Sequence, residues 1–443
     1  MSILTLTICL SSIVQLSLTA AKNMLGFLKR RTKKESHGHY VLALDIGTEF
    51  VKALIFEAKG AKGIVIGFGK ARQKLGDMSN GAVTDIGGVI DNCQAAIAEA
   101  EKQAGVIPTQ MIMGIAGELV KGDTTVTTYR RKNPETKIDL SELKNIVHKL
   151  QWRCFEDVRT QLAKETGYNE IDIKLVNAAI VGMEIDGYKV SNPIGFQGKE
   201  VTVTIFNAFA PLVHFGALQT IASELDIELL AITSEPYAVA RSMGFEDSGD
   251  LSTIFIDIGG GTTDIALVNN GTVEGTRMFM IGGRTFTKRL AHTLNVSFLD
   301  AEEIKLAYSD ENLEKHSYQI VREAMKSDAD VWLSGVELSL DDFKNVDTLP
   351  TRILLSGGGS NLPEIKEALE SKEWYKNLSF AEQPKISFLT PRDITNIEDQ
   401  TGQLKGPEHI TPLALANLAI DLAGEEQIIT SLLRKVVRLM QVG

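Results

Sequence analysis

A short pattern of strand, Asp-Ile-Gly, turn and strand occurs twice in this chain and strongly limits what the chain can fold into. The first copy is LALDIGTEFVKALIFE (42–57), and the second is IFIDIGGGTTDIALV (254–268). In each copy an apolar run leads into a glycine-containing turn and a second apolar run follows, which is typical of a β-hairpin. Two such hairpins far apart in the sequence predict a duplicated domain with a cleft between its halves.

The residues of the second turn suit a phosphate ligand. Glycine accepts the positive φ of a tight turn and lets backbone N–H groups approach a ligand closely. Successive N–H groups form a concavity that attracts anions. We therefore expect Gly259, Gly260 and Gly261 to admit phosphate groups. An aspartate at the strand end repels a phosphate unless a divalent cation lies between them, so we expect Asp257 to hold hydrated Mg²⁺.

A third glycine-rich segment, LLSGGGSNLPEIKEAL (354–369), is predicted to form a strand, a loop and a helix. A glycine-rich loop at a helix N-terminus suits a phosphate or a ribose. An ordinary turn explains either hairpin taken alone, and one glycine-rich loop is weak evidence. The two hairpins followed by this loop together indicate a nucleotide site.

The order of these three motifs resembles that of the superfamily that contains actin, hexokinase and the heat-shock chaperone ATPases. Its two phosphate motifs are similar to residues 45–48 and 257–264, and its adenosine motif is similar to residues 356–359. The segment SEPYA (234–238) resembles the acidic helix that connects the lobes in the chaperone branch. The resemblance implies an α/β protein with a duplicated actin-like ATPase fold, two lobes around a nucleotide cleft and an inserted α+β subdomain.

The superfamily resemblance also implies cofactors and the residues that contact them. The cofactors are ATP and Mg²⁺, with the ion held through water by Asp45 and Asp257. The residues implied to bind the cofactor are Asp45, Gly47, Thr48, Asp257, Gly259, Gly260, Gly261, Thr262, Thr263, Glu303, Lys305, Gly357, Gly358 and Gly359. Glu235 is a candidate for orienting a water molecule, and a structural role at the lobe junction is the alternative. We expect hydrolysis of ATP to be slow or absent.

Within this superfamily, several segments resemble FtsA, the bacterial division protein that ties FtsZ filaments to the membrane. They are the segment 80–105, the helix AEEIKLAY (301–308) and an insert at 119–205 that closes with SNPIGFQGKEVTV (191–203). The resemblance places Glu302 or Glu303, together with Lys305, near the base and ribose. It implies an adaptor that polymerises, binds FtsZ and other divisome proteins, and lies on the inner face of the cytoplasmic membrane at the division site.

The resemblance and the patterns along the chain divide it into seven predicted parts. They are an apolar and basic N-terminal segment (1–39), the first part of the first lobe (40–118), the insert (119–205), the second part of the first lobe with the interdomain helix (206–250), the second lobe (251–390), a return to the core (391–424) and an amphipathic C-terminal helix (425–443).

The two ends of the chain are candidates for membrane contact. Residues 425–441 place apolar side chains on one face and basic ones on the other, as an interfacial helix does, although the same stripe would also suit docking on the protein's own surface. The basic arm 29–34 would contact anionic lipid or form a solvated tail. Residues 1–23, of which 1–21 carry no charge, are either an anchor or precede a true start at Met24.

Composition and missing motifs narrow the remaining functions. A net charge of −11 argues against general nucleic-acid binding, and three widely spaced cysteines form no zinc or disulfide pattern. A PilM-like role in type IV pilus assembly is the alternative that shares two lobes and an insert. A small-molecule kinase would need a catalytic aspartate in the first lobe, and Asp77, Asp85 and Asp91 lie in no recognisable sugar-binding motif. A chaperone would need a further peptide-binding domain after the ATPase.

Overall fold

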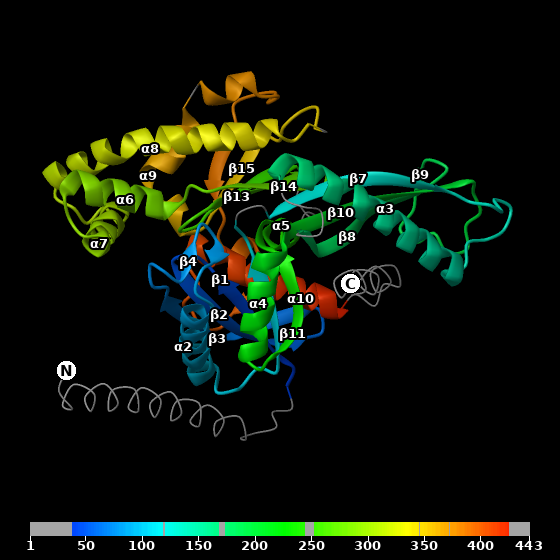
Figure 1. The fold of residues 1–443 in the computed structure, drawn as a ribbon, viewed down its shortest axis with the longest axis horizontal. Helices are drawn as coiled ribbons and strands as arrows, with labels where there is room; N and C mark the ends of the chain where they lie inside the picture. Colours follow the sequence, from blue (N-terminus) through cyan, green and yellow to red (C-terminus); the bar gives the residue numbers. More distant parts are fainter. Residues whose placement is uncertain are drawn as a thin grey trace, which may run out of the picture.

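In the described part of the chain, two large β-sheets, a two-stranded sheet and the helices packed on them form the fold (Figure 1). The computed structural model describes residues 38–117, 120–167, 173–243, 252–344, 346–371 and 373–424. The predicted basic arm, the segment 1–23 and the predicted amphipathic helix 425–443 lie outside these residues.

The first sheet has six strands in the order β11-β6-β1-β2-β3-β17. Their bounds are Glu228–Ser234 (β11), Gln110–Ile115 (β6), Tyr40–Ile46 (β1), Phe50–Lys59 (β2), Lys62–Arg72 (β3) and Ile397–Asp399 (β17). Strands β1, β2 and β3 form an antiparallel meander, whereas β6 and β11 run parallel to β1. The helices of this lobe are α2 (Ile86–Ala104), α4 (Leu212–Glu224), α5 (Glu235–Arg241) and α10 (Ile410–Gly424). A short hairpin of β4 (Met78–Ser79) and β5 (Ala82–Val83) precedes α2.

Helix α2 packs directly on β3 because two positions of that strand carry no side chain. A Cβ at Gly67 would lie 2.3 Å from the carbonyl oxygen of Ala100, and one at Gly69 would lie 2.0 Å from that of Ala96. The Asp85 carboxylate caps the start of the helix by accepting from the N–H of Gly87. Gly105 ends it with a left-handed φ of 70°. These contacts fix α2 against the meander that carries the first hairpin.

The second sheet has nine strands in the order β16-β15-β12-β13-β14-β7-β10-β8-β9, and it runs from the second lobe into the insert. In the second lobe the strands are β12 (Thr253–Ile258), β13 (Thr263–Asn269), β14 (Thr272–Phe279), β15 (Arg352–Ser356) and β16 (Lys385–Phe388). The helices there are α6 (Gly283–Leu294), α7 (Phe298–Ser309), α8 (Lys315–Asp341) and α9 (Pro363–Glu370). They enclose a core of their own, with Phe286, Trp332 and Leu355 among its buried side chains.

The insert contributes strands β7 (Lys121–Arg130), β8 (Ile173–Ile185), β9 (Tyr188–Lys189) and β10 (Glu200–Pro211), and helix α3 (Leu140–Thr166). Helix α3 covers one face of these strands and packs Leu143, Val147 and Leu150 into a third core. Figure 1 shows this unit projecting sideways from the lobes. The boundary expected at residue 205 falls inside β10, because this strand continues to Pro211 and buries Phe206 in the core of the first lobe.

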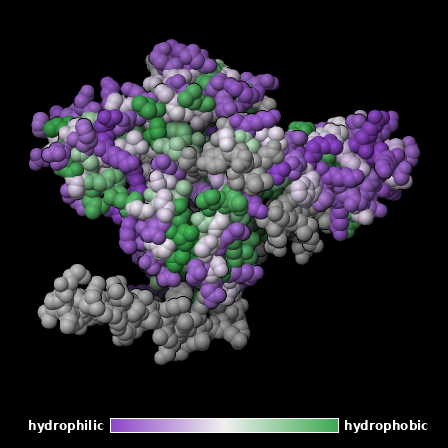
Figure 2. Space-filling model, in the orientation of Figure 1, coloured by the Kyte–Doolittle hydropathy of each residue, from purple (hydrophilic) through white to green (hydrophobic). Residues whose placement is uncertain are grey.

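The described surface is mixed in polarity. Figure 2 shows hydrophilic residues over much of the second lobe and the insert, with hydrophobic residues gathered around α4 in the first lobe. Val213, at the start of α4, is 85% exposed. In the described part of the chain, no helix has the length and apolar character needed to cross a membrane.

Candidate functional site

The two hairpins predicted from the sequence lie on either side of a cavity of about 290 Å³. The β1–β2 hairpin supplies Asp45 from the first lobe, and the β12–β13 hairpin supplies Asp257 from the second. The turns approach so closely that a Cβ at Gly260 would lie 3.0 Å from the Cβ of Glu49, and one at Gly261 would lie 2.7 Å from the Oγ1 of Thr48. Glycine at these positions therefore lets the two lobes meet beside the cavity.

Most of the predicted site residues line this cavity. They are Asp45, Gly47, Thr48, Glu235, Asp257, Gly259, Gly260, Thr262, Lys305, Gly357, Gly358 and Gly359. Three others, Gly261, Thr263 and Glu303, are not among the lining residues. Their placement shows what each of them does instead.

Gly261 packs against the opposite hairpin, as described above, and Thr263 belongs to the core. The Thr263 hydroxyl donates to the carbonyl oxygen of Ile281 at 2.7 Å and accepts from the indole N–H of Trp332 at 2.9 Å. Glu303 is exposed, whereas Glu302 is buried and faces the cavity. Residues three apart share a helix face, so Glu302 and Lys305 point together and Glu303 points away. The placement thus favours Glu302 and corrects the choice of Glu303.

Four carboxyl groups and one lysine that line the cavity lie close together: Asp45, Glu235, Asp257, Asp264 and Lys52. Asp45 accepts from the Lys52 ammonium at 2.8 Å across the first hairpin. Asp257 accepts from the hydroxyl of Thr411 at 2.7 Å and from that of Ser356 at 3.2 Å. Asp264, which lies opposite Asp257 in the second hairpin, accepts from Thr262.

These acids raise one another's pKa values. Burial, and then the charges of Asp45, Asp264 and Asp257, raise the pKa of Glu235 well above its usual value. Burial, and then the charge of Asp257, raise the pKa of Asp264 to about 8. Burial opposes the charged form of Lys52, yet the attraction of Asp45 is strong enough that its pKa is raised. One lysine thus faces four acids, and the site favours a bound cation or bound protons.

The donor set fits a hydrated divalent ion. Carboxylate and water oxygens are the ligands that Mg²⁺ prefers, and this ion usually keeps several of its waters. Within the described ranges, no group of three or more histidine, cysteine, aspartate or glutamate side chains is placed to hold a metal directly. A magnesium ion here would therefore be held largely through its own waters.

The third glycine-rich loop is anchored to the second hairpin. Gly357 has a φ of 83°, and a Cβ there would lie 2.3 Å from the Oδ1 of Asp257. Its N–H donates to the carbonyl oxygen of Pro407 at 3.0 Å. A Cβ at Gly358 would lie 3.8 Å from the Cβ of Glu408, its nearest described neighbour outside the adjoining residues, so this glycine borders the cavity with room beside it.

A buried network lies at the end of the cavity formed by α6 and α7. The Lys305 ammonium donates to the carboxylate of Glu302 at 2.8 Å, to the hydroxyl of Thr287 at 2.9 Å and to the carbonyl oxygen of Gly283 at 3.1 Å. The network holds the Lys305 side chain against the start of α6, which itself bonds to the second hairpin through Gly283 N–H and Gly259 O.

An ion pair between the lobes was not anticipated from the sequence. The Arg284 guanidinium donates through Nε to Glu49 at 2.7 Å and through Nη1 to the carbonyl oxygen of Met78 at 3.2 Å. Arg72 donates to the other oxygen of Glu49 at 2.7 Å. Glu49 lies in the first hairpin motif and Arg284 in no recognised motif, and the two are far apart in the sequence, so only the fold brings them together.

Comparisons with known proteins agree with this architecture. Residues 254–414, which contain the second hairpin and the third loop, match the family model described as "Cell division protein FtsA". The cell division protein FtsA of Neisseria meningitidis serogroup B is 28% identical over 277 residues, a span that covers 62% of this chain and 62% of that protein. The FtsA of Enterococcus faecalis is 24% identical over 401 residues, covering 85% of this chain and 87% of that protein.

A solved structure, the "PilM-PilN type IV pilus biogenesis complex", shares the fold. It has 17% sequence identity and a TM-score of 0.59, and the match covers 86% of this chain and 98% of that one. At this identity the likeness concerns the fold alone. The predicted α/β, actin-like ATPase fold is confirmed.

Proposed function

We propose that this chain, an FtsA-like protein of the actin and heat-shock chaperone ATPase superfamily, binds Mg·ATP in the cleft. It acts as an actin-like adaptor in bacterial cell division. The observation that carries the proposal is the pair of hairpins that bring Asp45 and Asp257 to one cavity together with the third glycine-rich loop. A Cβ at Gly259 would lie no closer than 3.5 Å to its nearest described neighbour, Thr262, and one at Gly358 would lie 3.8 Å from the Cβ of Glu408.

In the proposed complex the protein's residues have distinct roles. The backbone N–H groups around Gly47 and Gly259 bind the phosphates, and Asp45 and Asp257 hold the waters of Mg²⁺. The bound ion neutralises phosphate charge, which is the chemistry it supplies in phosphoryl transfer. Glu302 and Lys305 bind the nucleoside end, and their mutual hydrogen bond fixes both side chains before the ligand arrives.

Glu235 is the candidate for orienting a water molecule, and its surroundings make it a weak general base. Burial and three nearby aspartates raise the pKa of Glu235 well above its usual value, which favours the protonated form of this carboxyl group. A protonated carboxyl group is a poor general base. We therefore propose that nucleotide binding, rather than rapid hydrolysis, controls the activity of the protein.

The proposed cellular role is that of a tether. In this role the protein polymerises at the inner face of the cytoplasmic membrane and attaches FtsZ filaments to it at the division site. The curated relatives that are named as cell division proteins support this role.

Binding of a fluorescent ATP analogue with Mg²⁺ tests the nucleotide site. We expect Asp257→Asn to weaken binding by about tenfold or more, since charged hydrogen-bond partners contribute strongly. Asp91→Asn, on the exposed face of α2, is the matched control and should bind as the wild type does. Equal binding by Asp257→Asn and the wild type would contradict the site.

Sedimentation with purified FtsZ and anionic vesicles tests the adaptor role separately. The wild-type protein should bring FtsZ filaments down with the vesicles when Mg·ATP is present. A protein that binds Mg·ATP but never recruits FtsZ would keep the nucleotide site and overturn the proposed role in division.

A further inference from the structure

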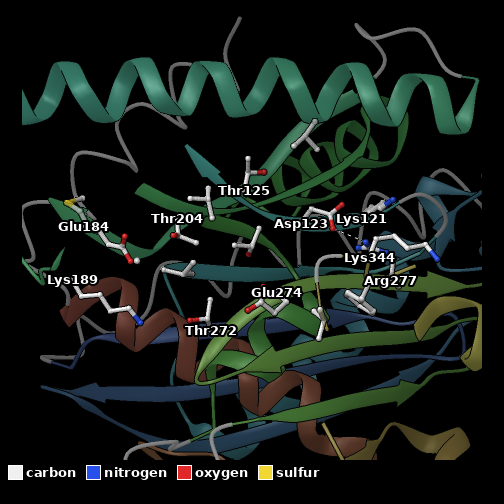
Figure 3. A pocket seen from close by; sticks show the side chains of 18 of the residues that line it. Lys121, Asp123, Thr125, Glu184, Lys189, Thr204, Thr272, Glu274, Arg277 and Lys344 are labelled. Carbon is white, nitrogen blue, oxygen red and sulfur yellow. Dashed lines mark ion pairs between the residues drawn. The ribbon is translucent and has the colours of Figure 1, made fainter. Parts of the chain in front are cut away.

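A second and larger cavity, of about 1130 Å³, separates the insert from the second lobe (Figure 3). Strands β7, β8, β9 and β10 line one side, and β14 with the residues after α8 line the other. We propose that this groove binds an extended segment of a partner protein, which adds as a strand to the free edge of β7 and places a basic side chain against Glu274. The inference goes beyond the proposed function and does not rest on nucleotide binding.

The first observation is that β7 has an open edge over most of its length. On one side it pairs with β10 at every position from Lys121 to Arg130. On the other side, among the described residues, β14 pairs with it only at Gly122 and Asp123. Beyond that point the Thr124 hydroxyl donates to the carbonyl oxygen of Val273 at 2.5 Å, and the two backbones diverge around the groove.

The direction of the free backbone groups follows from the bonds at the two ends of the strand. The carbonyl oxygen of Gly122 accepts from Arg277 on the β14 side, whereas the N–H of Arg131 donates to Lys199 on the β10 side. Backbone groups of successive residues in a strand point to opposite edges. The even-numbered residues, Val126 among them, therefore present their N–H and C=O groups to the open edge.

A partner strand can use these groups. Exposed edges of this kind are the usual place where an extended peptide adds to a sheet. The Thr128 carbonyl is partly engaged by the Arg153 guanidinium at 3.4 Å, and the described structure shows no bond for the backbone groups of Val126 on this edge. Val126 itself is 65% exposed. The open edge thus provides main-chain affinity without any change in the fold.

The second observation is a β-bulge that explains why the strands separate. In the β13–β14 pair, Leu267 lies opposite Gly275 and Val268 lies opposite Val273, so Glu274 is the additional residue. A bulge increases local twist, ends pairing and redirects a side chain. Here it turns β14 away from β7 and directs Glu274 into the groove (Figure 3).

Glu274 is the charged group that selects the partner. It is half-buried, and among the described residues it has neither a hydrogen bond nor an ion pair. Burial raises the pKa of this carboxyl group. The deeper charges at the other end are matched, since Arg277 pairs with both Asp123 and Asp342. An incoming lysine or arginine would give Glu274 the partner that it lacks.

The remaining lining suits a strand with β-branched side chains. Figure 3 shows Thr204 on the insert side and Thr272 and Glu274 on the side of the second lobe. Glu184 and Lys189 lie opposite each other in the β8–β9 pair. Glu274 is a half-buried acid that the bulge directs into the groove, and the occupant is an extended, basic, β-branched segment.

Selection of random peptides of about eight residues, displayed on phage, tests the proposal with the full chain. Val126→Pro removes one N–H from the open edge and none from the β7–β10 ladder, and proline is tolerated at such positions. Val126→Ala keeps the N–H and is its matched control. Glu274→Gln removes the selecting charge with little change in size.

We expect the wild-type protein to enrich peptides that contain lysine or arginine among β-branched residues. Synthetic versions should bind about tenfold more weakly to Val126→Pro and several-fold more weakly to Glu274→Gln, while Val126→Ala binds nearly as the wild type does. Unchanged Mg·ATP binding and thermal unfolding show that the variants are folded. If Val126→Pro unfolds, the same peptides are tested on the wild-type protein with methyl groups on alternate backbone nitrogens. Methylation of the nitrogens that face β7 should abolish binding, whereas methylation of the other nitrogens should not.

Three results would overturn the proposal. The first is that no peptide is enriched on the wild type relative to Val126→Pro. The second is that the wild type and Glu274→Gln enrich the same peptides. The third is selective binding in the groove of a synthetic peptide that copies residues 28–36 or 425–443, because the occupant would then be a segment of this chain.

Discussion

The two hairpins that enclose the cleft share a sequence pattern but differ in their charge balance. In the first hairpin, Asp45 lies opposite Lys52 and pairs with it at 2.8 Å. In the second, Asp257 lies opposite Asp264, and the two acids oppose each other's ionisation. The first lobe therefore brings a neutral pair to the cavity, whereas the second brings a site that needs a cation or protons. From this difference we expect the second hairpin to account for most of the dependence of nucleotide binding on a cation.

Removing the cation of the first hairpin should have the largest effect on stability. Lys52→Met leaves Asp45 and its neighbours buried without a positive partner, so the free energy of unfolding at neutral pH should fall by about 3 kcal/mol. Urea denaturation of the ligand-free protein measures this. Lys59→Met on the same strand removes an exposed pair with Glu57 and should change stability by less than about 0.5 kcal/mol. Equal effects of the two substitutions would contradict the charge balance.

The acids of the second hairpin should make the ligand-free protein less stable as the pH rises. The folded protein holds a proton on Asp264 up to about pH 8, whereas the unfolded chain releases it near its ordinary pKa of 3.8. Within that window the folded state binds more protons, so stability falls by about 1 kcal/mol per pH unit. Asp264→Asn should flatten the dependence between pH 6 and pH 8, as followed by urea unfolding. An unchanged slope would show that Asp264 is ionised in the folded protein.

The ion pair between the lobes should have a smaller effect. Glu49→Gln and Arg284→Lys each weaken one partner of a pair that joins the hairpin tip to α6. A double-mutant cycle should give a coupling energy of about 1 kcal/mol in unfolding. Arg322 and Glu367 form an exposed pair within the second lobe, and the same cycle there should give a coupling near zero. Similar coupling at both sites would mean that the lobe contact adds no stability.

A loss of similar size is predicted for the hydroxyl that α10 donates to the second hairpin. Thr411→Val removes the bond to Asp257 while keeping the shape of the side chain, and it should cost about 1 kcal/mol of stability. Thr395→Val removes a hydroxyl bond to the backbone outside the cavity and serves as the comparison. Only Thr411→Val should also weaken Mg·ATP binding, as measured by fluorescence titration. If Thr395→Val weakens it equally, the effect is not local to Asp257.

Local sequence patterns predicted the parts of the site that lie within one hairpin or loop. Asp45, Asp257 and the glycines follow from the strand–turn–strand pattern, and all but Gly261 line the cavity. Glu302 and Glu303 could not be separated, because choosing between neighbours on a helix requires knowing which face is buried. Lys52 could have been found from the hairpin register, which places it opposite Asp45.

Contacts between segments that are distant in the chain could not be predicted from local sequence patterns. Thr411 reaches Asp257 from α10, and Arg284 reaches Glu49 from the other lobe. Neither residue lies in a motif, and the fold alone makes them neighbours. The same holds for β7, whose weak pairing with β14 depends on a bulge at Glu274 that no periodicity in the sequence reveals.

Calorimetric titration with Mg·ATP in buffers of different ionisation enthalpy tests the central claim most directly. If a cation replaces protons at the second hairpin, wild-type protein should release protons on binding near pH 7.5, and Asp264→Asn should release fewer. Binding without proton release by the wild type, or no binding of Mg·ATP at all, would contradict the assignment of this cleft as a cation-dependent nucleotide site.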